Sequence, residues 1–166
     1  NPKCEHFGIC GGCKWQHIKY EEQLKFKEDE VKNNLVRIGN LTLPKITPIK
    51  GAVNNYFYRN KMEFTFSDKR WLYLKEIQSE AEITDKNALG FHVPGMFDKV
   101  VNLNNCYLQK DPSNAIRLSV KQFADKKKLT YFDIRNQQGL LRNLMIRTTS
   151  TNDLMVLIQF LSLIHI

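Results

Sequence analysis

The longest regular pattern of apolar and polar residues runs from position 16 to position 38. Apolar side chains recur there at spacings of four, seven, four and three residues, which places them on one side of an α-helix. Acidic residues near the start and an arginine near the end suit the two termini of such a helix. The apolar stripe consists of Tyr20, Leu24, Val31, Leu35 and Ile38. The pattern predicts a long amphipathic helix, followed by a proline-containing linker at residues 41–48.

A period of two replaces the helical period after the linker. Met62, Phe64 and Phe66 alternate with polar residues, which predicts a half-buried strand over residues 56–66. A polar turn follows, and we expect residues 71–77 to return as the hairpin partner of that strand. Gly139 and Asn152 mark turns near the end of the chain. Further strands are predicted at residues 89–92, 99–103, 129–135, 140–149 and 154–159.

One more helix is predicted, over residues 114–125. Asp111, Pro112 and Ser113 form a start signal directly before it, and Ile116, Val120 and Phe123 are its expected buried face. Helices are therefore few, and the strands are joined by short connections. This arrangement predicts an α+β fold with a mainly antiparallel sheet, a long N-terminal amphipathic helix and a metal-cluster loop at the N-terminus.

The metal prediction comes from the cysteines. Cys4, Cys10 and Cys13 are spaced C-x5-C-x2-C, and Cys106 is the only other cysteine in the sequence. Four thiolates suit either an iron–sulfur cluster or a structural zinc ion. The sequence shows no secretion signal, and C-x2-C spacing then favours a metal over disulfides. The spacing by itself leaves cluster and zinc equally open.

Glycines and histidines accompany the cysteines. Gly11 and Gly12 lack a Cβ, so we expect them to let the backbone turn tightly between two ligands. His6 and His17 flank the motif. With four thiolates available, both are expected to be surface histidines and not ligands.

The charge of the chain is unevenly distributed. The formal net charge is +8, and residues 1–38, with seven Lys/Arg and six Asp/Glu, account for only +1 of it. The remaining excess lies in residues 39–166, which favours a nucleic acid or another acidic surface as partner of that part. No apolar run reaches the roughly 18 residues that a membrane-spanning helix needs.

Several stretches of this sequence resemble one family, the bacterial RNA (uracil-5-)-methyltransferases, and most closely its 23S ribosomal RNA branch. The first is the cysteine segment from Cys4 to Cys13. The others are Tyr58-Arg59-Asn60-Lys61, Gly90-Phe91-His92, Cys106 in its loop, and Gly139-Leu140-Leu141-Arg142-Asn143. The resemblance extends from Cys4 to about Gln159, and the cysteine pattern is its most specific part.

The resemblance implies both a cofactor and an incomplete enzyme. It assigns Cys4, Cys10, Cys13 and Cys106 to a [4Fe–4S] cluster. The family also has an N-terminal RNA-binding barrel and a C-terminal domain that binds S-adenosylmethionine, and neither is recognisable here. The sequence is therefore expected to be a truncated fragment, the central domain of a cytoplasmic enzyme. We expect this fragment to be a monomer and to be inactive on its own.

The chemistry of uracil methylation agrees with that expectation. Methylation at C5 needs a nucleophile, usually a thiolate, to add at C6. If all four cysteines bind a cluster, no thiolate remains, so no catalytic residue is assigned. The glycines form no G-x-G, so no cofactor-binding loop is assigned either.

Candidate RNA contacts are basic. Arg59 and Lys61 could hold phosphates, and the aromatic residues 56–58 could stack on unpaired bases. The alternative is an ordinary strand with core aromatics and solvated charges. Arg142 and Arg147 are five apart on a predicted strand, so they should point to opposite faces. We prefer Arg142 because it lies in a stretch that matches the family.

These expectations divide the chain into four parts. Residues 1–15 are the cluster segment, residues 16–40 a helix that packs on the catalytic domain, and residues 49–160 the RNA-contacting α+β domain. Residues 161–166 resemble a translated sequencing adapter and are expected to be non-native. A different class of function stays open, namely a non-catalytic RNA-binding module stabilised by zinc or an iron–sulfur cluster.

Overall fold

The computed structural model describes residues 1–79 and 82–161. The chain separates into two compact units. One consists of Asn1–Lys3 and Trp15–Asn55, and the other of Cys4–Lys14 and Tyr56–Ile166. The cysteine segment thus belongs to the same compact unit as the sheet. None of the described helices is long and apolar enough to cross a membrane.

The first unit contains the predicted long helix. Helix α1 spans Tyr20–Asn33 and continues as one π-helical turn, η1, over Asn34–Ile38. It begins four residues later than expected, because the side-chain amide of Gln23 donates hydrogen bonds to the carbonyls of Trp15 and Ile18 (3.1 and 2.9 Å) and holds these residues in a turn.

The chain that leaves α1 returns along it. The backbone N–H of Ala52 donates to the Tyr20 hydroxyl (2.7 Å), and that of Ile49 donates to the Glu28 carboxylate (3.0 Å). No residue of α1 is buried, and Val31 remains 57% exposed. Part of the apolar stripe predicted for this helix is therefore exposed in the described structure.

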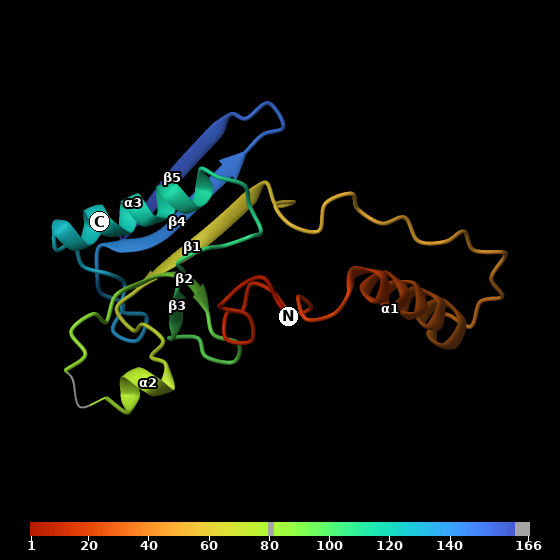
Figure 1. Ribbon diagram of the computed structural model, residues 1–166, viewed down its shortest axis with the longest axis horizontal. Helices are drawn as coiled ribbons and strands as arrows, with labels where there is room; N and C mark the ends of the chain where they lie inside the picture. Colours follow the sequence, from red (N-terminus) through yellow and green to blue (C-terminus); the bar gives the residue numbers. More distant parts are fainter. Residues whose placement is uncertain (80–81, 162–166) are drawn as a thin grey trace, which may run out of the picture. The chain divides into compact units, whose positions relative to one another are not determined.

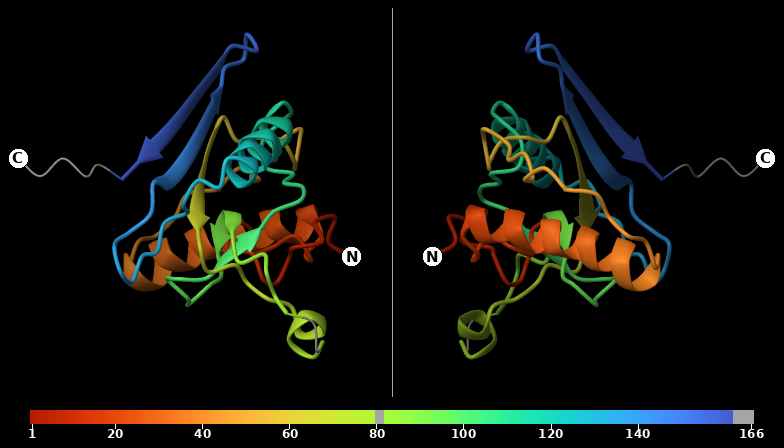
Figure 2. Two further views of the ribbon diagram at one scale, coloured as in Figure 1. Left: turned by 90° about the vertical axis from the view of Figure 1, so that its left-hand side faces the viewer. Right: turned by 90° about the vertical axis from the view of Figure 1, so that its right-hand side faces the viewer.

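The second unit is built on an antiparallel sheet of five strands (Figure 1). The strands are β1 Lys61–Ser67, β2 Ala88–His92, β3 Val100–Asn102, β4 Leu141–Thr148 and β5 Leu154–Phe160. Their order is β3-β2-β1-β4-β5. Helix α3, Ser113–Lys126, lies on one side of the sheet (Figure 2). The α+β class and the antiparallel sheet are confirmed.

The core of the second unit is formed by the apolar residues that alternate with polar ones along the strands. Met62, Phe64 and Phe66 of β1 are buried, as their spacing predicts, together with Leu144 and Ile146 of β4. Residues between them on each strand point to the other face. The partly buried residues Ile9, Cys10, Cys13, Ile116 and Val120 pack against this core. The cysteine segment and α3 are therefore both anchored to the sheet.

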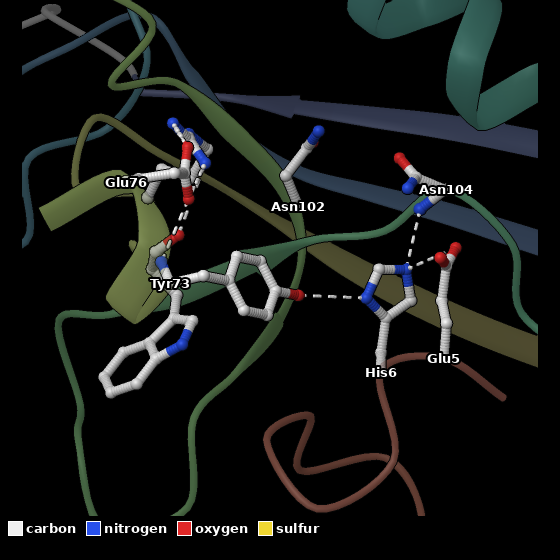
Figure 3. A pocket seen from close by; sticks show the side chains of 8 residues that line it. Glu5, His6, Tyr73, Glu76, Asn102 and Asn104 are labelled. Atoms are coloured by element: carbon white, nitrogen blue, oxygen red, sulfur yellow. Dashed lines mark hydrogen bonds and ion pairs between the residues drawn. The ribbon is translucent and has the colours of Figure 1, made fainter. Parts of the chain in front are cut away.

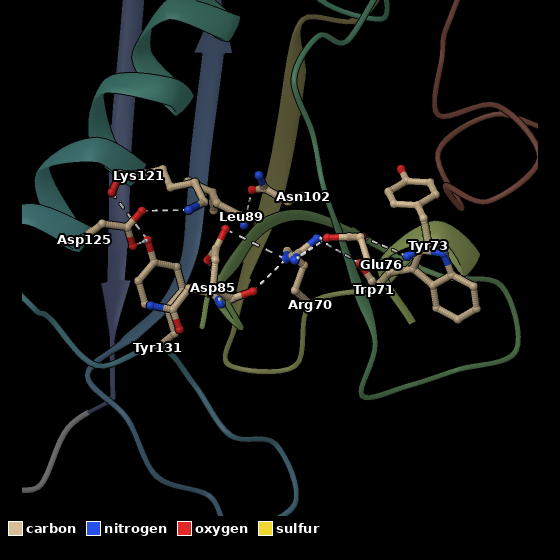
Figure 4. A network of polar contacts seen from close by, with 11 residues as sticks. Arg70, Trp71, Tyr73, Glu76, Asp85, Leu89, Asn102, Lys121, Asp125 and Tyr131 are labelled. Carbon is tan, nitrogen blue, oxygen red and sulfur yellow. Dashed lines mark hydrogen bonds and ion pairs between the residues drawn. The ribbon is translucent and has the colours of Figure 1, made fainter. Parts of the chain in front are cut away.

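The strand predicted over residues 71–77 is wrong. Leu74–Ile77 forms a short helix, α2, and β1 pairs with β2 and β4. Polar contacts explain the difference (Figure 4). The Arg70 guanidinium binds both carboxylate oxygens of Glu76 at 2.8 and 3.3 Å, and Glu76 accepts from the backbone N–H of Tyr73 at 2.9 Å. These bonds favour a capped helical turn over an extended chain.

The strand predicted over residues 129–135 is also wrong. Only isolated bridges occur there, and the Asp133 carboxylate closes a turn by accepting from the backbone N–H groups of Arg135 and Asn136 (2.9 and 3.3 Å). Aspartate competes with strand pairing in this way. Residues 56–60 precede β1 instead of belonging to it, since Phe57 and Arg59 donate their N–H groups to residues 107 and 108.

Helix α3 occurs where it was predicted, but its buried face differs. Ile116 and Val120 pack on the core, whereas Phe123 is 58% exposed and its predicted burial is wrong. Arg117 is fully buried instead.

After β5, Leu161 donates its N–H to the carbonyl of Leu140 (2.8 Å). The remainder of the tail predicted to be non-native, residues 162–166, lies outside the described residues.

Candidate metal centre and nucleic-acid interface

The cysteine segment docks on strand β2 through its two glycines. Gly11 donates its N–H to the carbonyl of His92 (3.0 Å), and a Cβ at Gly11 would lie only 2.7 Å from that oxygen. A Cβ at Gly12 would meet the Phe91 ring at 3.2 Å. Gly11 therefore permits close approach of two backbones, and Gly12 leaves room for the Phe91 ring, in addition to the turn that the sequence predicts.

The four cysteines lie within electrostatic reach of one another. The pKa of Cys10 is raised to about 11, mainly by burial and to a smaller extent by the thiols of Cys106, Cys4 and Cys13. Cys106 is buried, the other three are half-buried, and none forms a disulfide. Two backbone donors reach sulfur: Gly12 N–H lies 3.4 Å from Cys10 Sγ, and Leu108 N–H, which lowers the pKa of Cys106, donates to that thiol.

Four cysteines are a donor set that suits either a zinc ion or an iron–sulfur cluster. Among the described residues, no three His, Cys, Asp or Glu side chains are placed so that they could hold one metal ion. A zinc ion needs all four sulfurs at about 2.3 Å from one centre. In an iron–sulfur cluster each thiolate binds its own iron, so the sulfurs surround a larger volume, and N–H donors to sulfur are usual there.

Polar side chains hold the cysteine loops in place. Asn114 of α3 accepts from the backbone N–H of Cys106 (2.9 Å) and donates to its carbonyl (3.0 Å). His6 is only 3% exposed, so its predicted surface position is wrong, whereas His17 is exposed as predicted. His6 Nε2 accepts from the Asn104 N–H at 3.0 Å, and its Nδ1 lies 3.3 Å from the Tyr73 hydroxyl. Burial lowers the pKa of His6, which favours the neutral ring that these contacts require.

A pocket of about 350 Å³ opens beside this histidine (Figure 3). The Tyr73 hydroxyl points toward His6 from one side, and Glu5 lies on the other side of the ring. The lining consists of Glu5, His6, Arg70, Trp71, Tyr73, Glu76, Asn102 and Asn104. The acid Glu76 is neutralised by Arg70, so the pocket is polar without a free basic group that would attract phosphate.

Two of the predicted RNA contacts lie at the start of β1, where Arg59 precedes the strand and Lys61 is its first residue. Arg59 and Lys61 are both exposed. Lys61 is paired in register with Arg147 of β4, so two cations face each other across the ladder. Arg147 is exposed as well. We preferred Arg142 over Arg147 as an RNA contact, because the pairing of distant strands cannot be predicted from the spacing of residues in one strand.

Arg142 has a different environment. Its guanidinium carbon lies 4.0 Å from the centre of the Phe132 ring, and the side chain is half-buried. The register of β4 against β5 shifts between Leu141 and Asn143. The prediction that Arg142 and Arg147 point to opposite faces assumed regular alternation along the strand. The register shift at Arg142 interrupts that alternation.

Only one of the three predicted stacking residues is open to solvent. Tyr56 and Phe57 lie against Tyr107, with ring centres 6.2 and 6.0 Å apart. Tyr58 is 62% exposed. The aromatic group is therefore mainly an internal cluster that carries Tyr58 and Arg59 at its edge.

Comparison with known proteins finds relatives that share one description, RNA methyltransferase. No family model matches the chain. An uncharacterized RNA methyltransferase of Bacteroides thetaiotaomicron is 50% identical over 157 residues, which cover 95% of this chain and 35% of that protein. Proteins of the same description from Porphyromonas gingivalis and Chlorobaculum tepidum are 49% and 40% identical and are covered to 35% and 32%. The chain thus spans about a third of the length of the curated relatives it matches.

A solved structure has a similar fold. The Pyrococcus abyssi tRNA (uracil-54, C5)-methyltransferase, in complex with S-adenosyl-L-homocysteine, matches 91% of this chain and 31% of its own length. The TM-score is 0.63 and the sequence identity 23%, so this likeness concerns the fold. Over nearly its whole length, then, the chain is a relative of proteins named RNA methyltransferases, and it corresponds to about one third of them.

Proposed function

We propose that this chain is the central part of an S-adenosylmethionine-dependent RNA (uracil-5-)-methyltransferase that modifies 23S ribosomal RNA in the cytoplasm. One observation carries the proposal: 95% of the chain aligns at 50% identity with a protein named an RNA methyltransferase. The cysteine pattern supports the uracil-5 class, and the fold of the archaeal uracil-C5 enzyme agrees with it. The ribosomal substrate rests on the resemblance of the cysteine and basic stretches to that branch.

In this proposal Cys4, Cys10, Cys13 and Cys106 hold a [4Fe–4S] cluster. When bound, the cluster supplies four iron–sulfur bonds that cross-link two segments distant in sequence. The chain contributes the docking of Gly11 on β2 and the grip of Asn114 on the Cys106 backbone. The role of the site is then to fix the cysteine segment against the sheet that carries the RNA contacts.

RNA binding is assigned to the basic side chains around β1. Arg59, Lys61 and Arg142 are the predicted contacts, and Arg147 joins them because it faces Lys61. These side chains hold and orient the backbone of the RNA by charge. The nucleophile and the S-adenosylmethionine site belong to the part of the parent protein that lies outside this sequence. We assign the exposed stripe of α1 as the surface that contacts that catalytic domain.

The metal is tested first. The chain, purified without oxygen, should be brown and contain iron and acid-labile sulfide in similar amounts. Replacing any one ligand cysteine by serine should lower the iron content, whereas Ser119→Cys would only add a thiol on the exposed side of α3 and should leave it unchanged. A colourless protein with one zinc per chain would contradict the cluster.

The substrate and the missing chemistry are tested next. Affinity should be higher for a structured 23S fragment than for a transfer RNA transcript of similar length at the same salt concentration. Incubation with radiolabelled S-adenosylmethionine should transfer no methyl group to either RNA. Methyl transfer by this chain would mean that one of the four cysteines is a nucleophile, and equal affinity for all RNAs would support the non-catalytic binding module.

A further inference from the structure

Arg117 is a fully buried arginine in the middle of helix α3. Its Nη1 donates to the carbonyl of Leu103. Its Nη2 donates to the Asn104 carbonyl (3.2 Å) and to the side-chain oxygen of Asn114 (3.0 Å). Its guanidinium carbon lies 5.5 Å from the centre of the Phe64 ring. Its Nε has no hydrogen-bond partner among the described residues.

This cation lacks a carboxylate partner. No aspartate or glutamate in the described parts of the chain forms an ion pair with it. Burial lowers the pKa of Arg117 to about 10, which still leaves it charged at neutral pH. A buried charge without a counterion is strongly destabilising, because it has lost its hydration without gaining an opposite charge. Neutral oxygens accept hydrogen bonds from its two Nη groups but leave its net charge uncompensated.

The group near Arg117 that can carry a negative charge is the cysteine centre, through Cys106. Arg117 lowers the pKa of the Cys106 thiol, and Cys106 raises that of Arg117. Asn114 connects the two residues, since its side-chain oxygen accepts both from the Cys106 backbone N–H and from Arg117 Nη2. The same side chain therefore positions the ligand and the cation.

We propose that Arg117 is the buried countercharge of the cysteine centre, a positioning residue that stabilises the thiolate-bound cluster without ligating it. The inference rests on the proposed function, because it needs a metal at the four cysteines. An oxidised [4Fe–4S] cluster with four thiolates is a dianion, and one added electron makes it a trianion. A fixed positive charge stabilises the trianion more, so Arg117 raises the reduction potential. The free-energy cost of burying the Arg117 charge is offset only when the cysteines hold the negatively charged cluster.

The test replaces the charge within the whole chain. Arg117→Gln removes it while keeping an amide donor, Arg117→Lys keeps it, and Lys126→Gln removes an exposed charge from the same helix. The cluster is titrated with dithionite and mediators, and its reduced state is followed by electron paramagnetic resonance. We expect Arg117→Gln to lower the equilibrium constant for one-electron reduction about tenfold, a potential more negative by about 59 mV. Arg117→Lys should restore most of this change, and Lys126→Gln should have no effect.

A loaded Arg117→Gln protein with the wild-type potential would overturn the proposal. If Arg117→Gln loses its cluster, the iron content of Arg117→Lys becomes the test. A cluster retained in Arg117→Lys supports the countercharge, and a cluster lost from both variants overturns it. Thermal unfolding adds a second criterion. Arg117→Gln should destabilise the loaded protein more than the metal-free protein, whereas equal losses in both would indicate a purely structural residue.

The proposed cluster can fail separately. If the wild-type chain contains zinc, the cluster assignment is wrong, but four thiolates on zinc also form a dianion. Release of zinc to a chelator then replaces the potential as the measurement. Arg117→Gln should release zinc about tenfold faster than wild type and Arg117→Lys should not; equal rates would overturn the countercharge.

Discussion

Lys61 of β1 and Arg147 of β4 are directly opposite each other in the antiparallel ladder. Side chains in such pairs are about 5 Å apart at Cβ, and like charges there repel. Lys61 Nζ lies 3.7 Å from Glu63 Oε2, whereas no acidic residue in the described part of the chain forms an ion pair with Arg147. A bound RNA phosphate would relieve this repulsion, and for that reason we propose the pair as an RNA contact.

The first prediction concerns this pair. Lys61→Ala and Arg147→Ala should each weaken RNA binding and reduce the slope of log affinity against log salt by about one unit or less. Fluorescence anisotropy with a labelled 23S fragment over a salt series measures both quantities. Lys126→Ala on α3 is the control and should behave as wild type. Unchanged affinity in both variants, with unchanged folding, would mean that the pair is merely solvated.

A second prediction separates Arg142 from that pair. Its stacking on Phe132 means that Arg142→Ala should lower the free energy of unfolding by about 1 kcal/mol. Arg142→Lys keeps the charge but not the planar stack, so it should lose most of that stability and retain RNA affinity. Urea unfolding and anisotropy together distinguish the two roles. If Arg142→Lys keeps full stability, the stack contributes nothing measurable.

The docking of the cysteine segment gives a third prediction. Gly11→Ala should reduce iron content per chain and lower the unfolding temperature, because its Cβ would meet the rigid backbone carbonyl of His92 at 2.7 Å. Gly12→Ala should be milder, since the Phe91 ring at 3.2 Å is a side chain that can shift. Metal analysis and calorimetry on both proteins check this order. A fully loaded Gly11→Ala protein would exclude close docking.

The fourth prediction is a dependence on pH. Lys69, 2.6 Å away, holds the pKa of Asp133 well below its usual range, and Asp133 in turn raises the pKa of Lys69. The carboxylate contribution to stability is complete above the unfolded pKa of about 3.9 and is lost as pH falls below it. The lysine contribution is complete below about 10.4 and is lost as pH rises further.

Asp133→Asn should therefore flatten the fall in stability on acidification below pH of about 4. Urea unfolding of wild type and variant at a series of pH values measures the slope. Asp153→Asn, at the exposed β4–β5 turn, controls for loss of one acid. If wild type and Asp133→Asn lose stability in parallel below that pH, the Lys69 contact is too weak in solution to matter.

The fifth prediction concerns the exposed stripe of α1. Val31→Glu and Ile38→Glu should change the free energy of unfolding by no more than about 0.5 kcal/mol, because both side chains already face solvent. They should also reduce self-association, since an uncovered apolar face favours it. Light scattering and thermal unfolding test these effects. A large loss of stability in either variant would show that the stripe is packed within this chain.

Local chemistry determined a good part of the structure. Buried and exposed side chains alternate along β1, because successive residues of a strand point to opposite faces of the sheet and one face is buried. Helix α3, strands β2 to β5 and the antiparallel class follow from short-range apolar patterns bounded by turn residues. The four cysteines and the basic excess after residue 38 are properties of composition, so they pointed to a metal and to RNA without coordinates.

Tertiary structure decided what depends on residues far apart in the chain. Residues 71–77 have an apolar pattern suited to a strand, but the bonds of Arg70 to Glu76 favour a turn. Arg117 reads as a solvated charge on a helix, and only the approach of the 103–106 loop buries it beside Cys106. The facing of Lys61 and Arg147 arises from pairing across nearly the whole sheet domain. Such relationships result from long-range packing, which the spacing of residues within one element does not encode.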